Sequence, residues 1–303
     1  MTTRTSPSAR RNLDASAVSA MAPVVAVLPV WLLAITVWWL PFRSAYGISL
    51  PVFAGGYLAA GIVLFLRPVQ QWVLAPLLGA RRPTHDEVAV IAPAWRPVLQ
   101  MVDIPSNRYV VAVMPSNELN AFACGGHLVV VTTYALDALP RDELSGVLAH
   151  ELSHHLGLHT VALTIGQWLS LPVQVLARVG FFLQNVASAA TDSFARGSTA
   201  ATAIGRLISG LLTAVSWVFL AGLGLQSALA NAVGHSSELQ ADQRAVDMGF
   251  GRPLAMALRR VIAEFGDQRP TTWRARLEAS HPPARTRIAR IEALLRRHAN
   301  GER

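Results

Sequence analysis

The sequence predicts a mainly α-helical integral membrane protein, with four transmembrane helices and a domain outside the membrane that contains a small β-sheet. The first observation is composition: 52% of the 303 residues are hydrophobic and only 15% are charged, against about 25% charged in an average soluble domain. The mean hydropathy is +0.37. The second observation is three stretches without a charged side chain, at 15–42, 44–66 and 207–237. Each is longer than the roughly 20 residues that cross a bilayer as a helix.

These stretches divide the chain into five parts. We expect an N-terminal tail at 1–23, a two-helix transmembrane hairpin at 24–67, half of an extramembrane domain at 68–157, a second pair of transmembrane segments at 158–234 and a helical second half of the domain at 235–303. The third span is the least apolar, and its Gln and Arg side chains must face protein or water. A cleaved signal peptide is the alternative for the first span, but a second span follows it at once.

Charge indicates how the chain is oriented. The net charge is +8, and all 26 basic residues are Arg. Basic residues favour the cytoplasmic side of a membrane, so we expect a multi-pass protein of the inner or plasma membrane whose tail and extramembrane domain face the cytoplasm. Near the C-terminus the Arg side chains are interleaved with Glu and Ala in a helical pattern, for example at 285–297. That pattern favours solvated helix faces close to an anionic leaflet, and not nucleic-acid binding.

The extramembrane domain shows helix and strand patterns in a clear order. A helix is predicted at 87–102, followed by three short strands at 109–114, 121–124 and 128–133 that are separated by turn residues. The next helix opens near Pro140, because proline suits the first turn of a helix, and it ends near Gly157. The remaining helices are predicted at 239–248, 253–265 and 283–298.

The segment 150–154 reads H-E-L-S-H, which places His150 and His154 on one helical face and matches a zinc-hydrolase motif. A catalytic zinc needs three protein ligands and an open position for water. The best candidate for the third ligand is Glu238, and we expect one zinc ion per chain. Asp242 lies one helical turn after Glu238, and we expect it to accept the outward N–H of His150 and fix that ring.

Glu151 lies about 100° around the helix from His150, so it is better placed as a general base than as a ligand. In that mechanism zinc activates a water molecule, Glu151 takes its proton, and a polarised carbonyl is attacked. His155 and His159 lie off the face of the motif or beyond its reach, and we expect them to be interfacial or solvated. The single Cys124 excludes an internal disulfide and a cysteine-based zinc site, and packing is its expected role.

Four segments resemble the M48 family of integral-membrane zinc metallopeptidases, in particular its bacterial HtpX-like branch. These segments are the strand region at 120–133, the helix at 142–154, the E-L-Q-A-D segment at 238–242 and the H-P-P segment that begins at 281. The resemblance implies a gluzincin-type metallopeptidase domain, and thus a zinc metalloendopeptidase that acts on membrane or misfolded proteins in quality control at the bilayer.

The resemblance also implies roles for residues outside the zinc motif. His281 and Arg287 would stabilise the oxyanion, which requires donors aimed at the developing charge. The strand residues Asn120, Ala121, Phe122 and Ala123 would pair with an extended substrate backbone by β-strand addition.

Other functions stay open on the sequence. A signalling peptidase of the M56 type, which cleaves a regulator, is disfavoured because no extracytoplasmic sensor domain is evident. A catalytically inactive membrane scaffold is disfavoured because Glu151 is intact, and a scaffold does not need a general base. A non-peptidase zinc hydrolase is possible, since an activated water does not specify which carbonyl it attacks.

Overall fold

The computed structural model describes residues 20–194, 198–266 and 282–300. The chain forms two compact units. One, called here the helical unit, comprises Met21–Gly61 and Ile165–Ala230; the other, called the sheet unit, comprises Met1–Ala20, Ile62–Thr164 and Asn231–Arg303.

The helical unit contains α2 (Ala22–Tyr46), α3 (Leu50–Ile62) and most of α9 (His159–Phe194) and α10 (Thr199–Asp247). Within the described residues, three helices are long and apolar enough to cross a membrane: α2, α9 and α10. A fourth candidate is a pair, Leu50–Phe65 with Arg67–Leu77, that bends by 74°. The structure therefore supports three spans, or four if the bent pair counts as one.

Polar groups in the helical unit bond to one another, as expected for the third span. The Ser170 hydroxyl on α9 donates to Oε1 of Gln226 on α10 at 2.7 Å. The Tyr57 hydroxyl donates to the Trp168 carbonyl at 2.6 Å, and the two rings stack 4.8 Å apart. In an apolar environment such pairing avoids the cost of a lone polar group.

The sheet unit opens with a run of short helical turns: η1 (Val63–Phe65), α4 (Arg67–Val69), the π-helical η2 (Gln70–Leu74) and α5 (Ala75–Leu77). The side chain of Gln70 is fully buried. Its amide donates to the Leu64 carbonyl at 3.0 Å, and its carbonyl accepts from the His127 backbone N–H at 2.9 Å. Gln70 thereby ties this run to the turn between the last two strands.

Helix α6 (His85–Met101) begins with a complete capping box. The Glu87 backbone N–H donates to the Thr84 hydroxyl at 3.3 Å, and the Thr84 N–H donates to the Glu87 carboxylate at 2.7 Å. Two N–H groups that the first helical turn leaves without a partner are thus satisfied. Arg81 adds a bidentate ion pair to Glu87, with both contacts at 2.7 Å.

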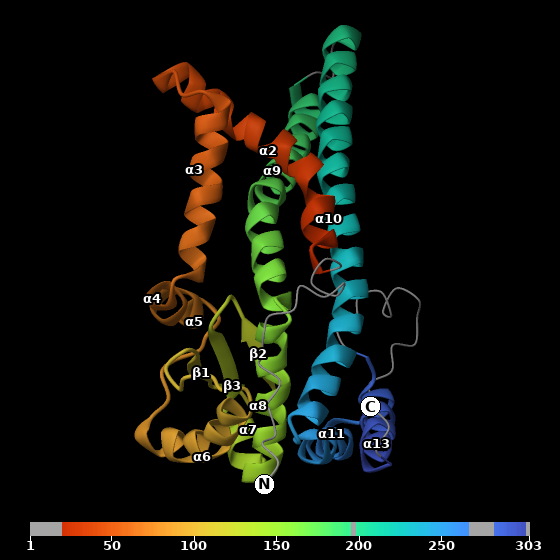
Figure 1. Ribbon diagram of the computed structural model, residues 1–303. Helices are drawn as coiled ribbons and strands as arrows, with labels where there is room; N and C mark the ends of the chain where they lie inside the picture. The colour runs from red at the N-terminus through yellow and green to blue at the C-terminus, as the bar shows by residue number, and fades with distance from the viewer. Residues whose placement is uncertain (1–19, 195–197, 267–281, 301–303) are drawn as a thin grey trace. The chain divides into compact units, whose positions relative to one another are not determined.

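The sheet has three strands, β1 (Val110–Met114), β2 (Ala121–Cys124) and β3 (Leu128–Thr132), in the order β1-β3-β2. Strand β3 lies in the centre, parallel to β1 and antiparallel to β2, and all five of its residues are buried. Cys124 packs partly buried against this core, and burial raises the pKa of its thiol. In the described part of the chain no strand pairs with the outer edge of β2 (Figure 1).

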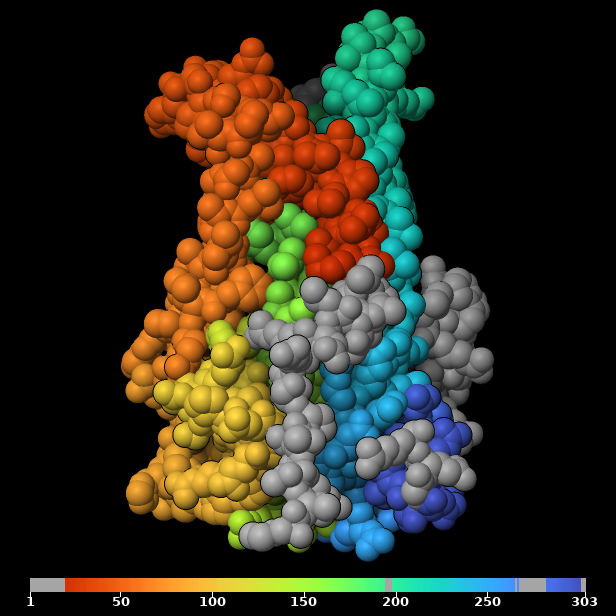
Figure 2. All heavy atoms as spheres, in the orientation of Figure 1, coloured from red at the N-terminus to blue at the C-terminus, as the bar shows by residue number. Residues whose placement is uncertain are grey.

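The remaining helices that lie wholly within the described residues of the sheet unit are α7 (Thr133–Ala138), α8 (Arg141–Leu156), α11 (Gly251–Phe265) and α13 (Ala284–Ala299). Helix α8 packs against α6, α11 and β2. The blue helices α11 and α13 lie side by side in Figures 1 and 2 and pack against each other. The predicted bounds of α8, α11 and α13 differ from the structure by one or two residues, whereas α7 was not predicted.

One expected helix end is absent. The sequence predicts a separate helix at 239–248, but α10 continues without a break from Thr199 to Asp247, through the expected domain boundary between 234 and 235. The change at this point is from apolar to polar composition, and no proline interrupts the helix after the apolar stretch. A change of solvent exposure does not end a helix, because it leaves the backbone hydrogen bonds intact.

Candidate metal centre

Two helices of the sheet unit bring the predicted ligands together. Helix α8 carries His150 and His154 one turn apart, and α10 carries Glu238. Nε2 of His150 lies 3.2 Å from Nε2 of His154. The two Glu238 carboxylate oxygens lie 3.3 Å from Nε2 of His150 and 3.2 Å from Nε2 of His154. All three side chains are buried, and their donor atoms lie within 4.8 Å of one another.

The spacing of these atoms fits a metal ion. A tetrahedral zinc with bonds of about 2.0–2.1 Å separates its ligand atoms by about 3.3 Å. The two Nε2 atoms lie 3.2 Å apart, and they lie 3.3 and 3.2 Å from different oxygens of the Glu238 carboxylate, so each of these contacts is close to that edge length. Two imidazoles and one carboxylate are also a donor set that zinc hydrolases use. The cluster therefore suggests a bound metal, for which zinc is the usual ion.

Asp242 and Arg287 lie behind His150. Oδ1 of Asp242 is 3.0 Å from Nδ1 of His150, the contact that the sequence predicts. The guanidinium of Arg287 on α13 binds both Asp242 oxygens, at 2.9 and 2.7 Å, and its Nη1 lies 3.1 Å from Glu238. Burial and the charge of Arg287 oppose protonation of His150, but the hydrogen bonds to Asp242 and Glu238 outweigh them and raise its pKa to about 9.

Glu151 is buried beside the two imidazoles, and burial raises its pKa above the usual value for a carboxyl group. It lines a cleft together with His150, Glu238 and Arg287. The predicted substrate strand lies along the same cleft: Asn120, Ala121 and Phe122 line it, and Ala123 is not among the described residues that do so. His281 lies outside the described residues.

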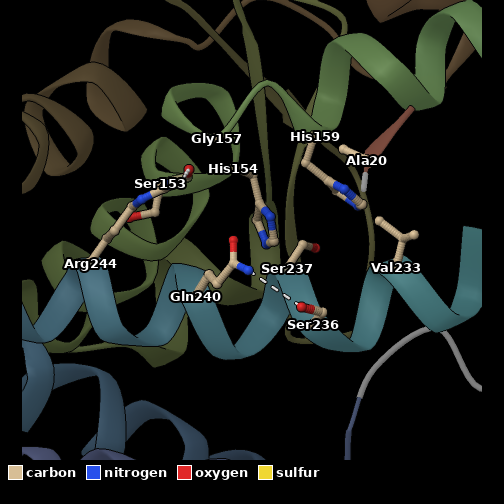
Figure 3. Close-up of a pocket in the computed structure, with 10 residues that line it drawn as sticks. All are labelled: Ala20, Ser153, His154, Gly157, His159, Val233, Ser236, Ser237, Gln240 and Arg244. Carbon is tan, nitrogen blue, oxygen red and sulfur yellow. Dashed lines mark hydrogen bonds between the residues drawn. The ribbon is translucent and has the colours of Figure 1, made fainter. Parts of the chain in front are cut away.

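A second, smaller pocket lies behind His154 (Figure 3). Residues of α10 form one side of it, among them Ser236, Ser237 and Gln240. Arg244, on the same helix, donates to the Ser153 carbonyl of α8 at 3.0 Å. This bond joins the helix that holds the two imidazoles to the helix that holds the carboxylate.

The expectation that His155 and His159 are interfacial or solvated is wrong, because both are buried, at 3% and 9% exposure. Nε2 of His155 is 3.0 Å from the Leu128 carbonyl of β3, and its ring lies beside Tyr109. Burial lowers the pKa of His155 to about 4. The ring of His159 lies 5.7 Å from that of His154. Helix α8 is covered on the face opposite the metal ligands as well, which its sequence pattern does not reveal.

The site agrees with what comparison to known proteins shows. A model of Peptidase family M48 matches residues 89–295, which include both halves of the cluster. This chain belongs to family M48. It is 30% identical over 226 residues to "Protease HtpX homolog 1" of Streptomyces coelicolor, with 67% of each chain covered. It is 25% identical over 269 residues to "Protease HtpX homolog" of Salinibacter ruber, with 79% of this chain and 88% of that protein covered.

A solved structure shows a similar fold. The crystal structure of S. mikatae Ste24p aligns with a TM-score of 0.53 at 17% identity, over 85% of this chain and 62% of the other. This chain therefore spans less than two thirds of that protein. Together with the apolar helices, the M48 and HtpX matches make this chain a membrane metalloendopeptidase of the HtpX-like type, whose substrates are polypeptides.

Proposed function

We propose that this M48 protein is a zinc-dependent endopeptidase that holds one zinc ion per chain at His150, His154 and Glu238 and uses Glu151 as its general base. The proposal is supported by the convergence of three buried side chains, whose possible ligand atoms lie within 4.8 Å of one another, next to the buried Glu151 carboxylate in a cleft. A bound zinc ion polarises a carbonyl and lowers the pKa of water.

The protein's own groups would then handle the substrate and the protons. The Glu151 carboxylate takes a proton from the attacking water and delivers it to the leaving amine nitrogen. The Arg287 guanidinium, which lines the cleft, and His281 donate hydrogen bonds to the carbonyl oxygen as negative charge develops on it. The outer edge of β2 offers backbone N–H and C=O groups to an extended substrate. Asp242 fixes the ring orientation of His150.

We also propose that the sheet unit faces the cytoplasm and that the enzyme removes misfolded or membrane-protein segments. The Arg-rich composition of the extramembrane segments supports the orientation. A membrane-impermeant maleimide tests it on Glu118→Cys in a Cys124→Ala background, because Glu118 is exposed and Cys124 is the single cysteine. Labelling only after the cells are permeabilised is expected, and labelling of intact cells would refute the orientation.

Cleavage of an unfolded model protein by the detergent-purified chain tests the mechanism, with Glu151→Gln as the matched variant. We expect the variant to retain zinc while its kcat falls by about 10²–10⁴-fold, the usual contribution of a general base. Equal rates for the two proteins would refute the role of Glu151. Zinc without cleavage in the unmodified protein would favour a non-peptidase zinc hydrolase or an inactive scaffold.

A further inference from the structure

One wall of the cleft is an apolar stripe on α11. Leu254, Ala257, Leu258 and Val261 all line the cleft, and their spacing of three, one and three residues places them on a single helical face. Val147 of α8 continues the same wall. The opposite face of α11 is exposed, as the 47% exposure of Met256 shows.

Three charged side chains of α11 bind partners outside the cleft. Arg260 forms a bidentate ion pair with Glu143 on α8, with both contacts at 3.0 Å. Arg259 pairs with Glu292 on α13, and Glu264 accepts a hydrogen bond from the Tyr134 hydroxyl at 3.1 Å. None of the charged residues of α11 is among the described residues that line the cleft. The wall thus presents only apolar surface.

The wall is also held firmly against the helix that carries the metal ligands. A Cβ atom added at Gly146 of α8 would lie 2.4 Å from the backbone nitrogen of Leu254, so the two helices touch backbone to backbone at this point. The Glu143–Arg260 pair adds a second contact, three residues before Gly146 on α8 and six residues after Leu254 on α11. A wall fixed in this way can select a side chain by shape, because it does not move aside to admit a poor fit.

We propose that this wall, Val147 with Ala257, Leu258 and Val261, is the subsite that receives an aliphatic or other apolar side chain next to the cleaved bond. The proposal rests on the peptidase function above and names its substrate class: extended segments with an apolar residue beside the scissile bond. In a strand added to β2, alternate side chains point to opposite faces, so alternate substrate residues meet the wall. A charged side chain there would lose water and gain no partner.

Paired peptides test the subsite. They are built on a cleavage site mapped in an unfolded model protein and differ only in carrying Leu or Glu on either side of the cleaved bond. We expect kcat/KM to be at least about tenfold higher for the Leu peptide, the scale on which apolar pockets discriminate. Binding to Glu151→Gln, measured by fluorescence anisotropy, should show the same order without any turnover.

Substitutions in the wall give the sharper result. Val261→Lys should lower the ratio of Leu-peptide to Glu-peptide kcat/KM by about tenfold or more, because it offers the Glu side chain a partner. Val261→Thr, which nearly preserves volume, should lower the ratio in the same direction by less, and it serves if the Lys variant does not fold. The matched control is Met256→Lys, which adds the same charge to the exposed face of α11 and should leave the ratio unchanged.

Two results would overturn the subsite. One is equal cleavage and equal binding of the Leu and Glu peptides by the unmodified wall. The other is a change of ratio in Met256→Lys as large as in Val261→Lys. Neither result would contradict the proposed peptidase function, because peptides are cleaved in both cases. If the chain cleaves no model protein, the peptidase function fails; Leu and Glu peptides taken from an unfolded segment of that protein are then compared for binding to Glu151→Gln, and equal binding would overturn the subsite.

Discussion

At the scale of single residues, one buried network joins the metal ligands to their supports. Asp242 is fully buried and contacts both His150 and Arg287. Its negative charge therefore compensates the guanidinium and fixes the imidazole at the same time. A buried charge that loses its partner destabilises the folded protein. Removal of any one member of this network is therefore expected to weaken the contacts of the others.

We predict that Asp242→Asn weakens zinc binding by about 10–100-fold, the range typical for loss of a carboxylate that orients a ligating imidazole. Zinc affinity would be measured by competition with a chelator. The control is Asp247→Asn on the same helix, because Asp247 is exposed and its ion pair is with His298, away from the cluster. Equal losses in the two variants would show that the Asp242 contact does not support the site.

At the scale of elements, α6 and α8 depend on specific contacts at their ends and faces. The hydrogen bonds from Arg81, with further ones from Thr84, overcome partial burial and lower the pKa of Glu87 from 4.5 to about 2. Between about pH 2 and pH 4.5 the folded protein therefore binds fewer protons at Glu87 than the unfolded chain does. The carboxylate stabilises α6 above pH 4.5, and this stabilisation is lost as the pH falls through 2.

The matching prediction concerns Glu87→Gln. Its melting temperature in detergent should lie below that of the unmodified protein at neutral pH, and the difference should shrink as the pH is lowered from about 5 toward 2. Differential scanning fluorimetry across this range measures it. A difference that stays constant with pH would mean that ionisation of Glu87 contributes nothing to stability.

Gly146 is the corresponding contact on α8. Gly146→Ala should destabilise the sheet unit by about 1–3 kcal/mol, because the added methyl group meets the backbone of Leu254 and forces α8 and α11 apart. The control is Gly210→Ala, where an added Cβ meets no atom within 4 Å and alanine improves helix propensity. Hydrogen exchange of the α8 and α11 amides would detect the change. Equal protection in both variants would contradict the close approach of these helices.

At the scale of the whole molecule, local signals predict the elements well. Strand β2 has the predicted bounds, Ala121–Cys124, and α8 runs between Pro140 and Gly157 as proline and glycine indicate. The spacing of the zinc motif places His150 and His154 on one helical face, and the need for a third ligand together with the spacing of Glu238 and Asp242 makes Glu238 the best candidate. These features depend on residues close in sequence or on the number of ligands that a catalytic zinc ion requires.

Features that depend on tertiary packing could not be predicted in the same way. The Arg287–Asp242 and Arg260–Glu143 pairs join residues 45 and 117 positions apart, and nothing in either local pattern identifies the partner. Burial of His155 depends on the contact of α8 with β3. The sequence predicts a helix at 253–265, but only the fold shows that one apolar face of this helix both packs against α8 and lines a cleft.

The proposed metal centre requires that His150, His154 and Glu238 together hold one zinc ion. The zinc content per chain of the purified protein, measured beside Glu238→Ala under identical conditions, tests this directly. We expect one zinc per chain in the unmodified protein and none in the variant. Equal zinc in both would contradict the assignment of Glu238, and no zinc in either would contradict the metal centre itself.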